Sequence, residues 1–257
     1  MDDLAPLLRF WRALDDLLER VEPTWWGAVV TDPRFPGIWD VNYARVETTD
    51  QDLTLAEVEA ALRPALAKSR AGQVHLVLSY PEELTRLLSE LGARGDRLSW
   101  DVAMLHRGDA PPPRDDVPVE EVHEFDDNYW NRHRASLREF EVIDEAALDQ
   151  LARIEQDVEI PAGKRWFMVR GDDEIKALGS LMVLEGVAYV DHVVTFPEAR
   201  GRGYASAIVS EIAAESSRAG AERIYLLAEL ESKAVALYER LGFERIGQLA
   251  SSLRPME

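Results

Sequence analysis

The 257-residue sequence contains no cysteine. This absence excludes disulfide bonds, thiolate metal ligands and any mechanism in which a cysteine carries an acyl group. The sequence also lacks an apolar run long enough for a transmembrane helix. Its first twenty residues include acidic side chains and lack the basic start and small-residue cleavage site of a secretory signal, so we expect a cytoplasmic protein.

Positive charge is scarce, because 29 lysine and arginine residues face 48 aspartate and glutamate residues, for a net charge of −19. Such a protein repels nucleic-acid phosphates and anionic membrane surfaces, so we expect neither as a partner. An acidic surface favours a cationic acceptor such as an amine, although solubility is the simpler explanation of the charge. The five histidines are scattered without the helical spacing of metal ligands, and we expect no metal site.

The clearest linker is the proline-rich segment 111–118, which predicts a stiff, extended spacer. It divides the sequence into a first domain over residues 1–110 and a second over residues 119–257. Both halves alternate strand-like and helix-like patterns, which indicates an α/β fold. In the first half, a capping box at Thr54 and Glu57 predicts a helix to about residue 69, and a further helix is expected over 81–91, ending at Gly92.

The two halves can be overlaid with a shift of 150 residues and no gap. Leu91-Gly92 then falls on Leu241-Gly242, and the strand expected at 74–78 falls on the one expected at 224–227. Because the order of elements also matches, we favour a degenerate internal repeat.

The most informative segment is Arg200-Gly201-Arg202-Gly203-Tyr204-Ala205-Ser206, between an apolar run at 189–194 and a helical pattern at 205–218. Glycines let the backbone approach a phosphate, and the free N–H groups and dipole of a helix start favour an anion. The segment therefore predicts an anion-binding turn, to which Arg200 and Arg202 add positive charge. The overlaid residues 50–55 contain two aspartates and neither glycine nor arginine, so the first copy is expected to lack this site.

Two motifs in the second half resemble a known family. Arg200-x-x-Gly203-x-Ala205 resembles the acyl-CoA-binding signature of the GNAT family of N-acetyltransferases, and residues 234–243, with Ala234-x-x-Leu237-Tyr238, resemble its second hallmark. The resemblance is close over residues 166–247 and weaker back to 117. It implies two tandem acyl-CoA N-acyltransferase (GNAT-like) domains, each a mixed twisted sheet flanked by helices. Only the second would bind acetyl-CoA.

The resemblance also implies where the acyl donor binds. The pyrophosphate would lie on the turn that begins at Arg200, where the expected donors are the main-chain N–H groups of Gly201, Arg202, Gly203, Tyr204 and Ala205 and the hydroxyl of Ser206. The pantetheine arm would pair like an extra strand with the main chain of Val193, Val194 and Thr195, beside which a neighbouring strand splays away.

Tyr238 matches the tyrosine that protonates the departing thiolate in many family members; a packed core tyrosine is the alternative. The family has no fixed base, and Asp191 and His192 both lie on the relevant strand. Strand alternation places them on opposite faces, so at most one faces the acceptor, and we prefer Asp191. A structural hydrogen bond is the alternative for either. Glu231 stands where the family often has asparagine, which leaves its role open.

The reaction implied by the resemblance is direct transfer of an acetyl group from acetyl-CoA, a co-substrate, to a primary amine of a small-molecule acceptor. A protein N-terminal or lysine acetyltransferase is one alternative, and a non-catalytic acyl-CoA-binding regulator is another. A homodimer is compatible with the sequence, which does not identify the acceptor.

Overall fold

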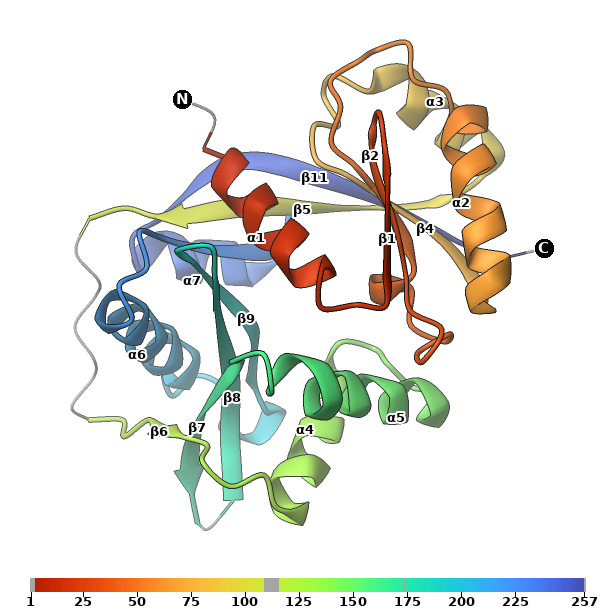
Figure 1. Ribbon diagram of the computed structural model, residues 1–257. Coiled ribbons are helices and arrows are strands. Elements are labelled where there is room, and N and C mark those ends of the chain that lie inside the picture. The colour runs from red at the N-terminus through yellow and green to blue at the C-terminus, as the bar shows by residue number, and fades with distance from the viewer. Residues whose placement is uncertain (1–2, 109–115, 173, 257) are drawn as a thin grey trace. The chain divides into compact units, whose positions relative to one another are not determined.

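The structure is a computed structural model that describes residues 3–108, 116–172 and 174–256 (Figure 1). Most of the linker predicted at 111–118 lies outside these residues. Two compact units are present, a larger one formed by the described residues of 3–10, 104–108, 116–172 and 174–246, and a smaller one formed by residues 11–103 and 247–256. Within the described ranges, no helix combines the length and the apolar character needed to cross a bilayer.

The larger unit is built on a mixed sheet. In spatial order its strands are parts of β11 (Phe243–Pro255) and β5 (Arg97–His106), then β10 (Arg223–Glu229), β9 (Val187–Thr195), β8 (Glu174–Leu184), β7 (Arg165–Gly171) and β6 (Glu120–Glu121). β9 and β10 are parallel, whereas the pairs from β9 to β6 are antiparallel. The parallel pair is connected through α6 (Tyr204–Arg218), the crossover that parallel strands require.

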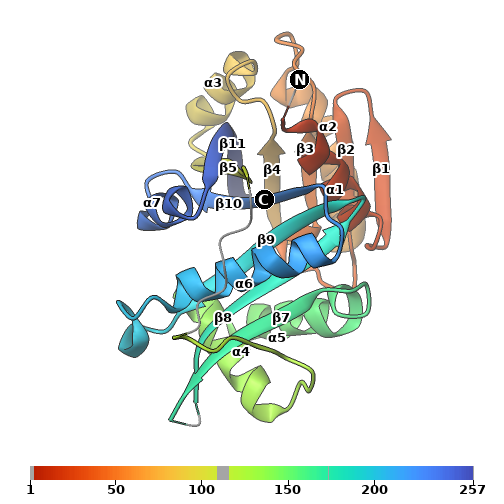
Figure 2. The ribbon, with the colours of Figure 1, turned by 90° about the vertical axis from the view of Figure 1, so that its left-hand side faces the viewer.

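Helices cover both faces of this sheet (Figure 2). On one face, buried isoleucines of α6 pack against β8 and β9. On the other lie α4 (Asp127–Glu139) and α5 (Glu145–Ile154), with Tyr129 of α4 in one apolar cluster with Trp166 and Leu178 of the sheet. α5 continues into a π-helical turn, η2 (Glu155–Glu159), and α7 (Lys233–Arg240) follows β10.

The smaller unit repeats the same local order of elements. Its strands β1 (Arg20–Thr24), β2 (Gly27–Thr31), β3 (Tyr43–Val46) and β4 (Gln73–Leu78) are followed in space by parts of β11 and β5. β3 and β4 are parallel and joined through α2 (Leu55–Ser69), which packs with α3 (Thr85–Arg94) on the apolar core. A 3₁₀ turn, η1 (Trp39–Val41), precedes β3, and α1 (Ala5–Asp15) begins in the larger unit and ends in the smaller.

Neither unit is a single consecutive segment of the chain. Residues 250–255 of β11 pair with β4 in the smaller unit, whereas residues 104–106 of β5 belong to the larger. The hydroxyl of Tyr225 donates to the carbonyl of Asp3 at 2.9 Å, which holds the N-terminal residues in the larger unit. The division into functional domains at 1–110 and 119–257 therefore stays a prediction.

The predicted capping box at the start of α2 is confirmed, because Thr54 and Glu57 exchange side-chain and main-chain hydrogen bonds. The helix expected over 81–91 is displaced, and its predicted end at Gly92 is wrong. Residues 80–84 form a turn in which Leu84 donates to the carbonyl of Pro81, so α3 begins only at Thr85. It ends at Gly95, whose φ of 84° provides the left-handed C-cap.

Gly179 of β8 allows α6 to pack closely on the sheet. A Cβ atom at this position would lie 2.5 Å from Ile208 Cγ2 and 3.3 Å from Ile212 Cδ1. We expect Gly179→Ala to lower the free energy of unfolding by about 1–3 kcal/mol in urea titration, because the helix must shift outward. Gly92→Ala is the control. Gly92 lies inside α3 with open space around it, so its substitution should raise stability by about 0.5–1 kcal/mol. Equal effects of the two substitutions would contradict this explanation.

Candidate active site

β9 contains one extra residue near its middle. Ser180 of β8 pairs with Asp191, whereas Leu178 pairs with Val194, so residues 192 and 193 together lie opposite Gly179. His192 adopts a left-handed conformation with a φ of 53°. This arrangement is a β-bulge, which bends the strand and redirects the side chains beside it.

The bulge overturns the expectation that Asp191 and His192 lie on opposite faces. Lys164 Nζ lies 3.5 Å from Asp191 Oδ2. The charge of Lys164 also acts on His192, whose pKa is lowered well below its usual range by burial, by His133 and by this lysine. Both side chains therefore lie near the same ammonium group. Alternation requires an extended backbone, and His192 does not have one.

Shortly before the bulge, the pairing between β9 and β10 ends. Their last paired residues are Tyr189 and Tyr225, although β9 continues to Thr195 and β10 to Glu229. On its other edge β9 stays paired with β8 up to Thr195. Within the described part of the chain, the edge of β9 over residues 190–195 has no strand beside it. Such an edge can accept an extended ligand through main-chain hydrogen bonds.

β9 is followed by a 3₁₀ turn, η3 (Pro197–Ala199), and then by a helix start without a side-chain cap. The N-cap of α6 is Gly203, with a φ of 80°, and Gly201 has a φ of 79°. Neither angle is readily adopted by a residue with a side chain. No carbonyl or side chain of the described residues accepts a hydrogen bond from the N–H groups of residues 204–206. Free N–H groups at the positive end of a helix dipole form an anion site.

The two arginines of the turn have different surroundings. Arg200 donates to the carbonyl of Thr195 at 3.1 Å and to the carboxylate of Glu139 at 2.6 Å, so its guanidinium ties the turn to β9 and α4. Arg202 is exposed and makes no ion pair with the residues that the structure describes. Arg202 is therefore the positive charge of the turn that remains available to an anion.

The equivalent helix start in the smaller unit is already occupied. The main-chain N–H of Leu55 donates to Glu90 Oε2 at 2.7 Å, and that of Thr54 donates to Glu57 Oε2 at 3.0 Å. Two carboxylates therefore occupy the positive end of α2, where an anion would otherwise bind. That the first half is a degenerate copy without an anion site stays a prediction.

Lys164, immediately before β7, is buried among carboxylates. Its Nζ donates to Glu155 Oε1 at 2.7 Å and to Glu159 Oε2 at 2.6 Å, besides the 3.5 Å contact with Asp191. Burial acts to lower the pKa of Lys164, but the three carboxylates outweigh it and hold the pKa well above its usual range. Burial raises the pKa of Glu159 to about 7, although Lys164 acts in the opposite direction.

The two histidines of the site stack and are neutral. The ring centroids of His133 and His192 are 5.4 Å apart, and Ser136 Oγ lies 2.6 Å from His192 Nε2. Burial and the charge of Lys164 lower the pKa of His133 to about 3. Asp191, with 48% of its side chain exposed, is therefore the better placed of the two candidate proton acceptors.

Tyr238 lies on α7 and is buried, with its ring edge against Phe243. Burial and then the charge of Asp191 raise the pKa of the Tyr238 hydroxyl to about 12. The phenol is thus protonated at neutral pH, and the charge of Asp191 acts on it. This is compatible both with a proton donor and with a packed core residue. Glu231, just before α7, is exposed.

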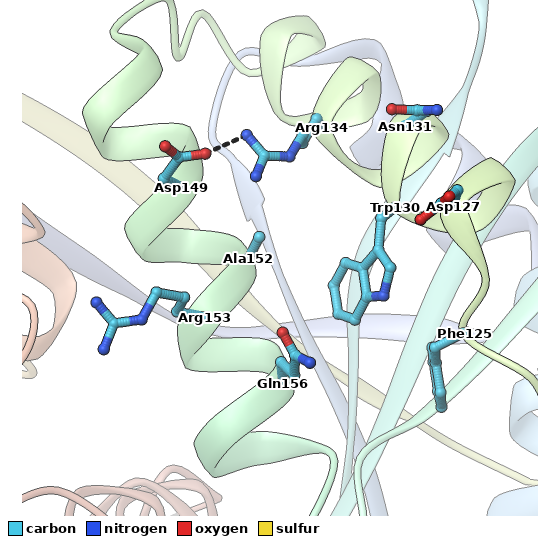
Figure 3. Close-up of a pocket in the computed structure, with 9 residues that line it drawn as sticks. All are labelled: Phe125, Asp127, Trp130, Asn131, Arg134, Asp149, Ala152, Arg153 and Gln156. Carbon is cyan, nitrogen blue, oxygen red and sulfur yellow. Dashed lines mark hydrogen bonds and ion pairs between the residues drawn. The ribbon is translucent and has the colours of Figure 1, made fainter.

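A cavity of about 980 Å³ lies between α4 and α5 (Figure 3). Phe125 and Trp130 form an aromatic wall, and an ion pair between Arg134 and Asp149 joins the two helices. Two other aromatic side chains of α4, Tyr129 and His133, are buried in the interior.

Comparison with known proteins agrees with this geometry. Residues 120–243 match the sequence pattern described as the acetyltransferase (GNAT) family. This match, over a little under half of the chain, assigns the segment 120–243 to the GNAT family. Lys164, Asp191, the glycine turn and Tyr238 all lie inside the matched segment. No group of three or more histidine, aspartate or glutamate side chains suited to a metal ion occurs among the described residues.

Individual relatives are distant. A 90-residue stretch is 29% identical to the uncharacterized N-acetyltransferase YobR of Bacillus subtilis and covers 35% of this chain and 36% of that protein. A GCN5-related N-acetyltransferase from Kribbella flavida has a TM-score of 0.65 at 18% identity, over 100% of this chain and 97% of its own.

Two further solved structures share the fold. A functionally unknown protein from Staphylococcus epidermidis has a TM-score of 0.68 at 14% identity, covering 88% of this chain and 90% of its own. A tandem GNAT protein from the clavulanic acid biosynthesis pathway has a TM-score of 0.56 at 14% identity, covering 78% and 69%. At such identities the likeness concerns the fold alone.

The sequence did not reveal the lysine cluster of this GNAT domain. The available signal was the pair Glu155 and Glu159, four residues apart and followed by Gly163-Lys164. The sequence did not indicate the π-helical turn or the bulge, so it gave no reason to place these residues near Asp191.

Tyr238 and Asp191 should be electrostatically coupled. We expect Asp191→Asn to lower the pKa of Tyr238 from its value of about 12, because the tyrosinate no longer faces a carboxylate. Tyrosinate absorption during alkaline titration measures this, and Tyr238→Phe identifies the signal among seven tyrosines. Glu239→Gln on the same helix is the control, since Glu239 pairs with Arg245. An unchanged titration in the Asp191 variant would show that the two side chains do not interact.

His133 should make folding sensitive to acid. Its pKa falls from 6.5 to about 3 in the folded chain, so the unfolded chain binds the proton more tightly between these values. Stability is therefore lost as the pH drops from 6.5 towards 3. We expect His133→Phe to lose less unfolding free energy than the parent between pH 7 and pH 5, measured by urea titration. His192 still contributes in the same direction. The exposed His123→Gln is the control and should match the parent.

Proposed function

We propose that this chain is an N-acetyltransferase that transfers the acetyl group of acetyl-CoA directly to a primary amine of a small-molecule acceptor. One observation carries the proposal: the unpaired edge of β9 over residues 190–195 is followed, after the short turn of residues 196–203, by the uncapped start of α6. An extended arm that ends in a diphosphate matches an open strand edge followed by an anion site.

The proposed donor site follows from these two features. The main chain of Val193, Val194 and Thr195 would pair with the pantetheine arm. The pyrophosphate would be bound by the main-chain N–H groups and side chains of the turn and helix start, namely Gly201, Arg202, Gly203, Tyr204, Ala205 and Ser206. Arg200 would hold the turn in place through Thr195 and Glu139.

The proposed chemistry uses two side chains. Asp191 would accept the proton that the acceptor ammonium must lose before its nitrogen attacks the thioester carbonyl. Tyr238, protonated at neutral pH, would donate its proton to the departing thiolate. Holding both reactants beside β9 would supply much of the rate acceleration through proximity.

The smaller unit is proposed to be a degenerate GNAT-like copy without a donor site. Support comes from its parallel pair β3 and β4 joined through α2, which matches β9, α6 and β10, and from the carboxylates at the start of α2. A cytoplasmic location and a homodimer stay predictions.

Coenzyme A binding tests the donor site. We expect Gly203→Val to weaken the affinity for coenzyme A at least about tenfold by titration calorimetry, because valine disfavours the φ of 80° and crowds the anion site. Gly220→Val is the matched control, since Gly220 has a φ of 75° just beyond the other end of α6 and open space around it. It carries the same backbone strain but should keep the parent affinity. If both variants bound coenzyme A with the affinity of the parent, the proposed location of the donor site would be wrong.

Turnover separates the candidate functions. Thiol release from acetyl-CoA should appear with at least one of ethanolamine, 2-phenylethylamine and spermidine. Release only with a peptide would favour a protein acetyltransferase. Coenzyme A binding without release on any acceptor would favour the non-catalytic regulator.

A further inference from the structure

The interior of the GNAT domain holds an unusual ionic cluster, formed by Lys164, Glu155, Glu159 and Asp191. Lys164 is 7% exposed, and its amine contacts all three carboxylates. One positive and three negative groups therefore share a largely buried space, in which Glu159 has a pKa of about 7.

Stability alone does not account for this cluster. Removing charges from water is costly, and a buried ion pair is often no more stabilising than well-packed apolar side chains of the same volume. Glu155 is held in place by a second partner, because its carboxylate also accepts a hydrogen bond from Trp166 Nε1 at 3.1 Å. The ammonium of Lys164 lies 5.3 Å from the centre of the same indole ring.

The three carboxylates of the cluster differ in their exposure to solvent. The side chains of Glu155 and Glu159 are 9% and 19% exposed, whereas that of Asp191 is 48% exposed. The π-helical turn η2 carries both glutamates to Lys164, and the bulge of β9 brings Asp191 to it. Asp191 is thus the most exposed member of the cluster, and it contacts the buried lysine from β9, the strand with the open edge.

We infer that Lys164 is a positioning residue, which holds the Asp191 carboxylate in place as the proton acceptor for the acceptor amine. This inference rests on the proposed acetyl transfer. The ammonium of Lys164 lies 3.5 Å from Asp191 Oδ2, and this contact fixes the carboxylate beside the bulge. The other charged and titratable groups around this pair come from η2, α4, α7 and β9: Glu155, Glu159, His133, Tyr238 and His192.

Lys164→Met tests the inference. The substitution leaves Asp191 beside two glutamates without their cation, so protonation of Asp191 is favoured. We expect kcat with the best amine of the panel to fall about 10- to 100-fold. The acidic limb of the pH–rate profile should move up by about one pH unit. The affinity for coenzyme A should stay within about twofold, and Lys164→Arg should recover most of the activity.

A matched control separates positioning from general loss of a buried charge. Arg45 of the smaller unit is equally buried, at 5% of its side chain, and pairs with Asp15 at 2.8 Å and Glu47 at 2.5 Å. Arg45→Met should lower the melting temperature without moving the pH–rate profile. If Lys164→Met behaves in the same way, Lys164 is structural and the inference is wrong.

A second measurement needs no turnover. In protein labelled with carboxyl-¹³C aspartate, and with the Asp191 signal assigned through Asp191→Asn, NMR titration follows this carboxylate directly. Its midpoint should rise by about one pH unit in Lys164→Met. An unmoved midpoint overturns the inference whether or not any amine is acetylated. A parent protein that acetylates none of the amines, yet shows the shift, contradicts the proposed function and leaves the electrostatic coupling intact.

Discussion

The left-handed residue His192 is the constraint on which the rest of the site depends. It places one extra residue in β9 opposite Gly179, and a bulge of this kind increases local twist. From Val190 onwards β9 leaves β10 but keeps β8, so a strand edge opens inside the sheet rather than at its border. The same bulge brings Asp191 to Lys164. One backbone irregularity therefore positions both the open edge and the carboxylate beside it.

The two parallel strand–helix–strand units of the chain differ in what occupies the start of the connecting helix. At α2, Glu57 and Glu90 accept hydrogen bonds from main-chain N–H groups, and the helix is complete by itself. At α6, Gly203 provides no side chain, and the first turn keeps its N–H groups. A carboxylate of the chain and an external anion compete for the same positive end of a helix. The sequence difference between residues 50–55 and 200–205 thus changes which N–H groups at the helix start are already hydrogen-bonded, and not the strand–helix–strand arrangement.

Local chemistry explains what could be predicted from the sequence. The glycine turn, the helix after it and the capping box at Thr54 depend on neighbouring residues, and the structure has them where the sequence indicates. The prediction that Asp191 and His192 lie on opposite faces of the sheet was wrong, because the bulge depends on the pairing of β9 with β8. No local sequence pattern encodes that pairing. The Lys164 cluster joins residues 155–164 to 191, and its geometry needs a π-helical turn that has no simple sequence signal. Long-range register and backbone irregularity are what the sequence left undetermined.

The sign of the charge around β9 also changes along the strand. Around Asp191, three carboxylates face one ammonium, and both histidines have pKa values far below neutrality, so the local charge is negative. At the far end of the strand, the uncapped start of α6 and Arg202 make the surroundings positive. A diphosphate would be drawn to the turn beyond the end of β9, and an alkylammonium group to the middle of the strand, near Asp191. The orientation of the proposed reactants would follow from this difference in charge. The excess of carboxylates near the amine also favours its unreactive ammonium form. The proposed reaction therefore needs a fixed carboxylate that accepts a proton from the ammonium group.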